Sequence, residues 1–225
     1  FKKVKSEYFI NEALKKGTKI LAEGAQGSLL DVDFGSYPFV TSSNTIAGGA
    51  TIGLGISPRA IDGVKGIFKA YCTRVGNGPF PTELNDDDGQ RLRDIGHEYG
   101  ATTGRPRATG WLDMVALKYA VMLNGITELF MMKADVLSGF KKVKVCTAYK
   151  IDGELTNEMP FAINDVTIEP VYEEFDGWDE DLTICRSWDS LPKTFQNFII
   201  AVEKMAGAPI NIISVGPDRE QTIIR

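Results

Sequence analysis

The segment WLDMVALKYAVMLNGITELFMM, residues 111–132, carries a helix pattern and a strand pattern on the two sides of one glycine. Apolar side chains at helical spacing predict a core-facing helix over residues 111–123, and Asn124 with Gly125 predicts its left-handed end. The repeating residues are Leu112, Val115, Tyr119 and Leu123. The apolar run 128–132 predicts a strand. A helix followed directly by a short apolar strand is typical of an α/β fold.

The rest of the chain repeats this alternation. Further helices are predicted over residues 2–16, from Ser57 and Pro58 onward, within 85–100 and over 190–206. Further strands are predicted over residues 20–22 and 70–75 and from Ile210. The Ser-, Thr- and Gly-rich run 40–55 predicts an ordered loop, and KVKVCTAYKIDGELT predicts a hairpin turning at Asp152 and Gly153. Residues 163–189 are interpreted as an edge strand with an irregular excursion.

These elements predict an α/β fold with a largely parallel central sheet flanked by helices and a smaller antiparallel hairpin region. The 225 residues fit a single α/β domain over 1–225. Ligands of such sheets bind at the carboxyl ends of strands. Polar turns that directly follow apolar strands are therefore the candidate sites.

Composition argues against several classes of protein. A net charge of -5 disfavours sequence-independent binding of nucleic acid, which needs a basic face. No apolar run approaches the ~20 residues of a membrane-spanning helix. Cys72, Cys146 and Cys185 lie far apart without CxxC spacing, which indicates reduced thiols rather than disulfides or a zinc site. We expect a cytoplasmic protein that binds neither nucleic acid nor membranes.

The turn MMKADVLSG places Lys133 and Asp135 just after an apolar strand. A carboxylate there can accept from both the ring N–H and the exocyclic amino group of guanine, while the lysine stem covers the purine and its ammonium stays solvated. A surface charge pair at a strand end is the alternative. In SVGPDR, Ser214 and Gly216 follow another strand and offer hydrogen bonds to a base edge, unless they form a plain β-turn.

Three other loops carry donors. Gln26 lies between glycines in EGAQG and can donate to a carbonyl oxygen or an oxyanion, and Thr41 can donate to phosphate; ordinary loop structure is the alternative for each. The loop ATTGRPR combines two hydroxyls with two arginines ahead of a helix, which favours binding of a small dianion or dicarboxylate over solvated arginines. Its donor residues are Thr102, Thr103, Arg105 and Arg107.

Metal and histidine chemistry find little support in the sequence. His97 is the only histidine and lies in a polar run, so we expect it at the surface. The acidic run 85–89 is interpreted as a turn or helix cap. We therefore expect no metal site in this chain.

Taken together and in this order, the motifs resemble the adenylosuccinate synthetase family over residues 19–225. The matching stretches are EGAQGSLLD, YPFVTSSNT, TRVGNGPFPTEL, GATTGRPR, TGWLD, KADVL and SVGPDR. The resemblance implies a ligase of purine nucleotide synthesis that joins L-aspartate to IMP. It would use GTP as co-substrate and magnesium as cofactor, and would release adenylosuccinate, GDP and phosphate.

The resemblance also implies roles for individual residues. Gln26 would contact the IMP base and stabilise its 6-oxyanion, Thr41 would bind the IMP phosphate, and Val75 would lie near the ribose. Arg105 would contact both aspartate and ribose, and Arg107 both aspartate and the GTP phosphates. The remaining implied contacts are Thr102 and Thr103 with aspartate, and Lys133, Asp135, Ser214 and Gly216 with guanine.

The family's phosphate loop, its principal catalytic aspartate and histidine, and its magnesium ligands belong to an N-terminal half that these 225 residues do not contain. We expect the chain alone to bind substrates without turnover. The resemblance also implies a homodimer. A stand-alone guanine-nucleotide or dicarboxylate binding module, and an interaction protein with relic site residues, are the alternatives. The leading hypothesis requires the loops around Arg105, Asp135 and Ser214 to meet at one rim of the sheet.

Overall fold

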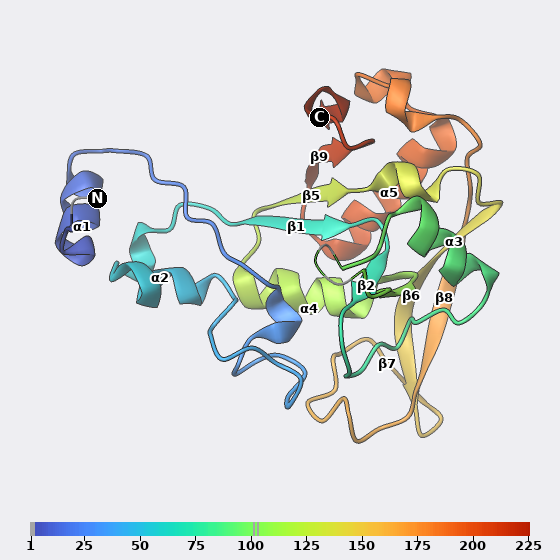
Figure 1. The fold of residues 1–225 in the computed structure, drawn as a ribbon, viewed down its shortest axis with the longest axis horizontal. Coiled ribbons are helices and arrows are strands. Elements are labelled where there is room, and N and C mark those ends of the chain that lie inside the picture. The colour runs from blue at the N-terminus through green and yellow to red at the C-terminus, as the bar shows by residue number, and fades with distance from the viewer. Residues whose placement is uncertain (1–2, 101, 103) are drawn as a thin grey trace.

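The computed structural model describes residues 3–100, 102 and 104–225, and it is a mixed α/β fold with a largely parallel sheet flanked by helices (Figure 1). Three strands of this sheet run parallel, and a fourth is antiparallel to its neighbour. In spatial order they are β1 (Lys65–Lys69), β5 (Glu128–Met132), β9 (Ile210–Ser214) and β10 (Thr222–Ile224). The predicted fold class is confirmed, and β5 has the predicted bounds.

The antiparallel region is a second sheet built around the long strand β6 (Lys142–Ile151). The predicted hairpin is present, because Asp152 and Gly153 have φ angles of 52° and 88° and join β6 to β7. The partners of β6 are β4 (Leu112–Asp113), which is parallel, and β7 (Glu154–Thr156) and β8 (Ile168–Asp176), which are antiparallel. A further antiparallel pair joins β2 (Cys72–Arg74) to β3 (Ala108–Gly110).

The helices α4 (Met114–Asn124) and α5 (Lys193–Ala206) pack against each other and against the sheets. The predicted helix over residues 111–123 is confirmed, but it begins at Met114 because Leu112 and Asp113 pair with β6. Gly125 (φ 58°) and Gly207 (φ 73°) end the two helices in the left-handed conformation. A third helix, α3 (Asp87–Ile95), lies beside β3.

The buried core joins α5 to the strands. Phe195 and Phe198 of α5 are fully buried, as predicted, and the Trp178 ring centroid lies 4.6 Å from that of Phe195. Leu129 and Met131 of β5 belong to the same cluster. None of the helices in the described ranges has the length and apolar character needed to cross a membrane.

The N-terminal part departs most from the predictions. It contains α1 (Ser6–Lys15) and α2 (Gly48–Leu54), which lie together at one end of the molecule, away from the sheets (Figure 1). The predicted strand at residues 20–22 is wrong: this stretch is extended without strand pairing, and Leu21 is 90% exposed. The predicted loop 40–55 is wrong over α2.

The helix predicted from Ser57 is also wrong beyond its first turn. Ser57 accepts a hydrogen bond from the Arg59 N–H, as a cap should, but only the single 3-10 turn Pro58–Ala60 follows. Val64 then lies just before β1 and Phe68 lies within it, because pairing with β5 takes this stretch into the sheet. The other 3-10 turns are Ser28–Leu30, Ala134–Leu137, Leu182–Ile184, Trp188–Ser190 and Arg219–Gln221.

Candidate functional site

The carboxyl ends of β1, β5 and β9 form one edge of the parallel sheet. Met132 pairs with Lys69 across β1 and β5, and Met131 pairs with Ile213 across β5 and β9. The segments that begin at Lys133 and Ser214 are therefore neighbours, as expected for two parts of one site.

Asp135 lies in the 3-10 turn Ala134–Leu137, directly after β5. Lys133 adopts a left-handed backbone (φ 58°), which turns the chain out of the strand. The Oδ1 atom of Asp135 is buried and has no hydrogen-bond partner among the described residues, and burial raises the pKa of this carboxyl. A buried acceptor without a donor calls for one from a ligand or water, which is compatible with the predicted guanine contact.

The turn after β9 is held by its own hydrogen bonds. Ser214 is buried, and its hydroxyl donates to the Gly216 carbonyl at 3.0 Å. The Val215 N–H donates to the Gln221 carbonyl at 2.9 Å. A Cβ on Gly216 would press against the side chain of Gln221, so glycine lets the two halves of this turn pack closely.

A single buried carboxylate, that of Glu98, links this edge to the loop ATTGRPR (residues 101–107), which we call the arginine hairpin. Its side chain is 0% exposed. Its Oε1 accepts hydrogen bonds from Lys69 (2.7 Å), Tyr71 (2.7 Å) and Lys133 (2.9 Å), and its Oε2 accepts one from Arg107 (2.8 Å). The Lys133 ammonium also donates to the Gly96 carbonyl. It is therefore bound by protein atoms, whereas the sequence predicted a solvated ammonium.

The electrostatics of this cluster favour an ionised Glu98. Burial alone would raise the pKa of Glu98, but hydrogen bonds from Lys69, Tyr71 and Lys133 outweigh it and lower the pKa from 4.5 to about 2. Burial lowers the pKa of Lys69 despite its contact with Glu98. Burial and the same carboxylate raise the pKa of the Tyr71 hydroxyl.

The arginine hairpin is closed at its base by Glu98. The Arg107 N–H donates to the Glu98 carbonyl (2.9 Å), and the Gly100 N–H donates to the Arg105 carbonyl (2.8 Å). Thr102 is exposed in the turn. The predicted contact of Thr103 lies outside the described residues.

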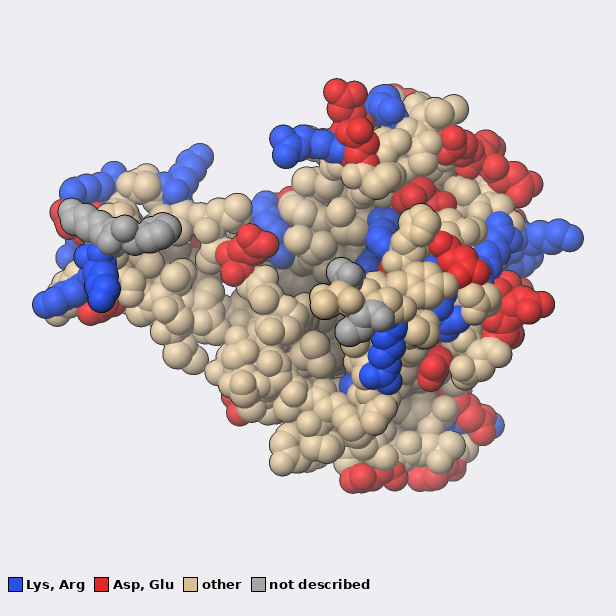
Figure 2. All heavy atoms as spheres, viewed as in Figure 1, with Lys and Arg blue, Asp and Glu red and all other residues tan. Residues whose placement is uncertain are grey.

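A pocket of about 320 Å³ lies beside this hairpin. Arg105 and Arg107 line it together. The Nε of Arg107 is buried without a hydrogen-bond partner among the described residues, so it can still donate. Acidic side chains gather along the lower and right-hand edges of the molecule (Figure 2). The remaining lining residues are Arg74, Gly76, Glu83, Arg93, Pro106 and Ala108.

A much wider cleft, of about 2840 Å³, separates the N-terminal segment from β1 and α4. Gln26, Val75 and Arg107 all line it. Such a volume exceeds the roughly 300–1,000 Å³ of an ordinary ligand pocket. Asp135 and Ser214 line neither this cleft nor the small pocket. The predicted meeting of the loops around Arg105, Asp135 and Ser214 in one site thus remains a prediction, although Glu98 connects Arg107 to Lys133 in the segment after β5.

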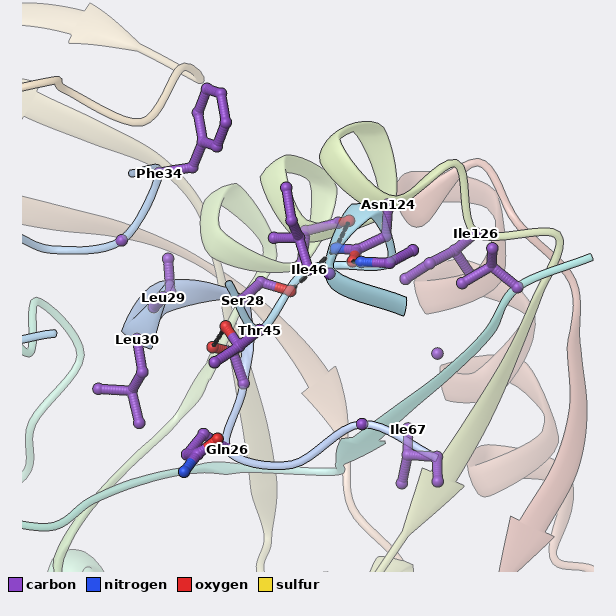
Figure 3. A pocket seen from close by; sticks show the side chains of 18 of the residues that line it. Gln26, Ser28, Leu29, Leu30, Phe34, Thr45, Ile46, Ile67, Asn124 and Ile126 are labelled. Atoms are coloured by element: carbon purple, nitrogen blue, oxygen red, sulfur yellow. Dashed lines mark hydrogen bonds between the residues drawn. The ribbon is translucent and has the colours of Figure 1, made fainter. Parts of the chain in front are cut away.

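Gln26 owes its position in the cleft to contacts between its loop and α4 (Figure 3). Asn124, the last residue of α4, donates to the Ser28 hydroxyl (2.9 Å) and accepts from the Ala47 N–H (2.7 Å). Thr45 donates to the Gly27 carbonyl at 2.7 Å. Gln26 itself has a left-handed backbone (φ 64°).

The remaining predictions concern Thr41, His97 and a metal site. The Thr41 N–H donates to the Leu30 carbonyl (2.8 Å), and Thr41 does not line the wide cleft. His97 is exposed, as predicted. Within residues 3–100, 102 and 104–225, no group of three or more His, Cys, Asp or Glu side chains could hold a metal ion.

The sequence did not single out Glu98 or Lys69. Glu98 follows His97 in a polar run, where a glutamate is usually solvated. Only the packing of four separate segments buries it, and no local pattern signals that packing. The left-handed backbone of His97 (φ 49°), directly before Glu98, is visible only in the structure.

Comparison with known proteins gives a consistent family. The model of the adenylosuccinate synthetase family matches residues 2–223. The chain is 59% identical over 225 residues to the adenylosuccinate synthetase of Parabacteroides distasonis, covering 100% of this chain and 53% of that protein. It is 61% identical over 222 residues to the one of Christiangramia forsetii, covering 99% of this chain and 52% of that protein.

Solved structures agree. The fully ligated adenylosuccinate synthetase from Plasmodium falciparum superposes with a TM-score of 0.94 at 46% identity, over 99% of this chain and 54% of that one. The succinoaminodeoxyadenylate synthetase of cyanophage S-2L, at 19% identity and a TM-score of 0.61, shares the fold over 97% of this chain and 49% of its own. The chain spans about half the length of the curated relatives it matches. With the family model matched from residue 2 to residue 223, this chain belongs to the adenylosuccinate synthetase family.

Proposed function

We propose that this chain provides the guanine, L-aspartate and part of the IMP binding surfaces for the GTP-dependent ligation of L-aspartate to IMP. One observation carries the proposal: Lys133 and Arg107 bind the two oxygens of the same buried Glu98 carboxylate. The family assigns these two residues to guanine and to aspartate with the GTP phosphates. Their common anchor supports a site that holds both ligands side by side.

The chemistry requires positioning above all. The 6-oxygen of IMP takes the γ-phosphoryl group of GTP, which releases GDP; the aspartate amine then attacks C6 and displaces phosphate, and adenylosuccinate forms. Gln26, in the wide cleft, would donate to the 6-oxygen as negative charge develops there. Val75 and Thr41 would contact the ribose and the phosphate of IMP.

The other two ligands would bind near Glu98. Asp135, with its buried acceptor oxygen, would bind the guanine donors together with Ser214 and Gly216. Arg105 and Arg107 would bind the aspartate carboxylates from the small pocket, assisted by Thr102 and Thr103. Arg107 would also reach the GTP phosphates.

The family also implies magnesium, a homodimer and a cytoplasmic location. The described residues offer no cluster for magnesium, so no step of the reaction is assigned to a metal bound by them. Self-association and the cytoplasmic compartment are parts of the proposal that rest on family membership.

Calorimetric titration of the purified 225-residue chain with GDP, IMP and L-aspartate tests the proposal. We expect weak binding of all three, because each would contact only some of its partners here. Tight binding of one ligand alone would instead indicate a stand-alone binding module, and binding of none would contradict the proposal. We also expect no adenylosuccinate from GTP, IMP and aspartate; product formation by the pure chain would overturn that part.

A further inference from the structure

The cluster around Glu98 has an unequal charge balance. Three cationic side chains, Lys69, Lys133 and Arg107, bind a single carboxylate. Counting these four groups gives three positive charges against one negative charge, a surplus of two. Their side chains are 28%, 38% and 31% exposed, whereas Glu98 is 0% exposed. The cations thus reach solvent at the site while their shared anchor does not.

The backbone around Glu98 is as firmly held as its side chain. The Glu98 N–H donates to the Arg93 carbonyl (2.8 Å), and its carbonyl accepts from the Arg107 N–H (2.9 Å). On the preceding side, the Gly96 carbonyl accepts from Lys133. Glu98 therefore contacts Arg107 through both its side chain and its backbone. It contacts Lys133, in the segment after β5, through its side chain, and the neighbouring Gly96 adds a backbone contact to the same lysine.

We infer that Glu98 is a positioning residue whose two carboxylate oxygens hold Lys69 and Lys133 on one side and Arg107 on the other, so that the segment after β5 and the arginine hairpin adopt their binding positions together. The inference rests on the proposed function for the identity of the ligands, GDP or GTP at the first segment and L-aspartate at the second. Glu98 itself touches neither ligand in this scheme. It acts through the three cations.

Removing the charge of Glu98 should release both segments at once. A neutral side chain can satisfy fewer of the four donors, and the three cations then repel one another without compensation. A displacement of about 1 Å in a binding group can cost on the order of a hundredfold in function. Binding of both ligands should therefore weaken together, although they contact different segments.

The first test needs no ligand. We expect Glu98→Gln to raise the rate of acetylation of Lys69 and Lys133 several-fold in a mass-spectrometric labelling experiment, because their ammonium groups lose their shared partner. Lys142, which binds Asp176 at 2.7 Å on the surface, should keep its rate. Unchanged rates at Lys69 and Lys133 would overturn the inference. An equal rise at Lys142 would overturn it too, because it would indicate general loosening.

The matched control is Glu203→Gln. This substitution also removes a paired carboxylate, because Glu203 binds Arg225 (2.6 Å) and the Ile210 N–H (2.8 Å). Glu203 lies in α5 and contacts the amino end of β9 at Ile210, opposite the end that carries Ser214. We expect it to leave the labelling of Lys69 and Lys133 unchanged.

The second test measures the dissociation constants of GDP and of L-aspartate for the same three proteins. We expect Glu98→Gln to weaken both by about tenfold or more, and Glu203→Gln to change neither. Weakening of only one ligand would contradict the joint positioning. If the unsubstituted chain binds neither ligand, the proposed function fails, whereas the labelling result still decides whether Glu98 positions the three cations.

Discussion

Tyr149 donates a 2.5 Å hydrogen bond to the Oδ2 atom of Asp113, and both side chains are buried. Asp113 belongs to β4 and Tyr149 to β6, so the bond ties the second sheet to the start of α4. The other oxygen of Asp113 accepts from the Ala116 N–H (3.1 Å) and caps that helix. Asp113 also lines the wide cleft, so this pair fixes one wall of the candidate site.

We expect Tyr149→Phe to lower the free energy of unfolding by about 1–3 kcal/mol at pH 7, because it leaves a buried acceptor without its donor. Burial raises the pKa of Asp113, and loss of the Tyr149 bond should raise it further. A carboxyl whose pKa is raised by folding adds stability at low pH that is lost as pH rises through the folded pKa. The loss should therefore be smaller at pH 4 than at pH 7.

Urea unfolding at the two pH values measures this difference. Tyr119→Phe is the control, since its hydroxyl donates to the Phe34 carbonyl in an exposed position. It should change stability by less than about 0.5 kcal/mol. An equal loss at pH 4 and pH 7 for Tyr149→Phe would show that Asp113 does not titrate as described.

The sequence predicted best where local pattern and tertiary packing agree. The strand Glu128–Met132 and the helix Lys193–Ala206 have apolar faces that the sheet buries, and Gly207 ends the helix at the position where the pattern stops. The Asp152–Gly153 turn was equally predictable from the sequence, because both positions need a positive φ. These features follow from short-range chemistry.

Prediction failed where contacts with distant segments determine the local structure. Residues 20–22 look like a buried strand, yet they lack a neighbouring strand within the described ranges. The Ser57 cap is real, but pairing of β1 with β5 ends its helix after one turn. The role of Glu98 was not predicted because it also depends on distant segments. Its four partners lie at sequence separations from 9 to 35 residues.

Asp31 organises the loop between Gln26 and Thr41, two residues proposed to contact IMP. Its carboxylate is fully buried and accepts four backbone hydrogen bonds. The donors are the N–H groups of Asp33, Phe34, Thr45 and Ile46. We expect Asp31→Asn to weaken this loop by about 1–3 kcal/mol, because an amide has only one acceptor oxygen. Hydrogen exchange at the four donor amides should accelerate.

The pH dependence of this effect has the opposite sign to that of Asp113. Burial alone would raise the pKa of Asp31, but the four backbone bonds lower it below 3.8. Its stabilisation is therefore present above about pH 3.8 and lost as the pH falls through the lowered pKa. Asp33→Asn, at an exposed carboxylate that binds Asn44, is the control and should leave those amides protected.

Gly96 sets how closely Tyr71 and Glu98 can pack. A Cβ at this position would press against the Tyr71 hydroxyl and lie 2.6 Å from the Leu92 carbonyl oxygen. We expect Gly96→Ala to lower the free energy of unfolding by about 1–3 kcal/mol through overpacking. Gly53→Ala, which meets no atom within 4 Å in α2, should be neutral or slightly stabilising. Equal urea midpoints for the two variants would contradict this account.

Asp135 gives the most direct test of base recognition. Its buried Oδ1 lacks a partner among the described residues, so a guanine ring N–H and amino group would satisfy the carboxylate. In Asp135→Asn, one acceptor becomes a donor that faces the donors of guanine. We expect GDP binding to weaken by about a hundredfold or more. Xanthosine diphosphate, which has a carbonyl in place of the amino group, should bind this variant better than GDP.

The control for Asp135→Asn is a variant that removes a negative charge close to Asp135. Asp181→Asn does so, since Asp181 lies near enough to raise the pKa of Asp135, while asparagine can still cap the turn at Thr183. Its GDP affinity should stay within a few-fold of the unsubstituted chain, because only surface charge changes. If both variants lose GDP equally, charge rather than hydrogen-bond matching governs binding. If neither loses it, the guanine lies elsewhere, and the segment after β5 has another role.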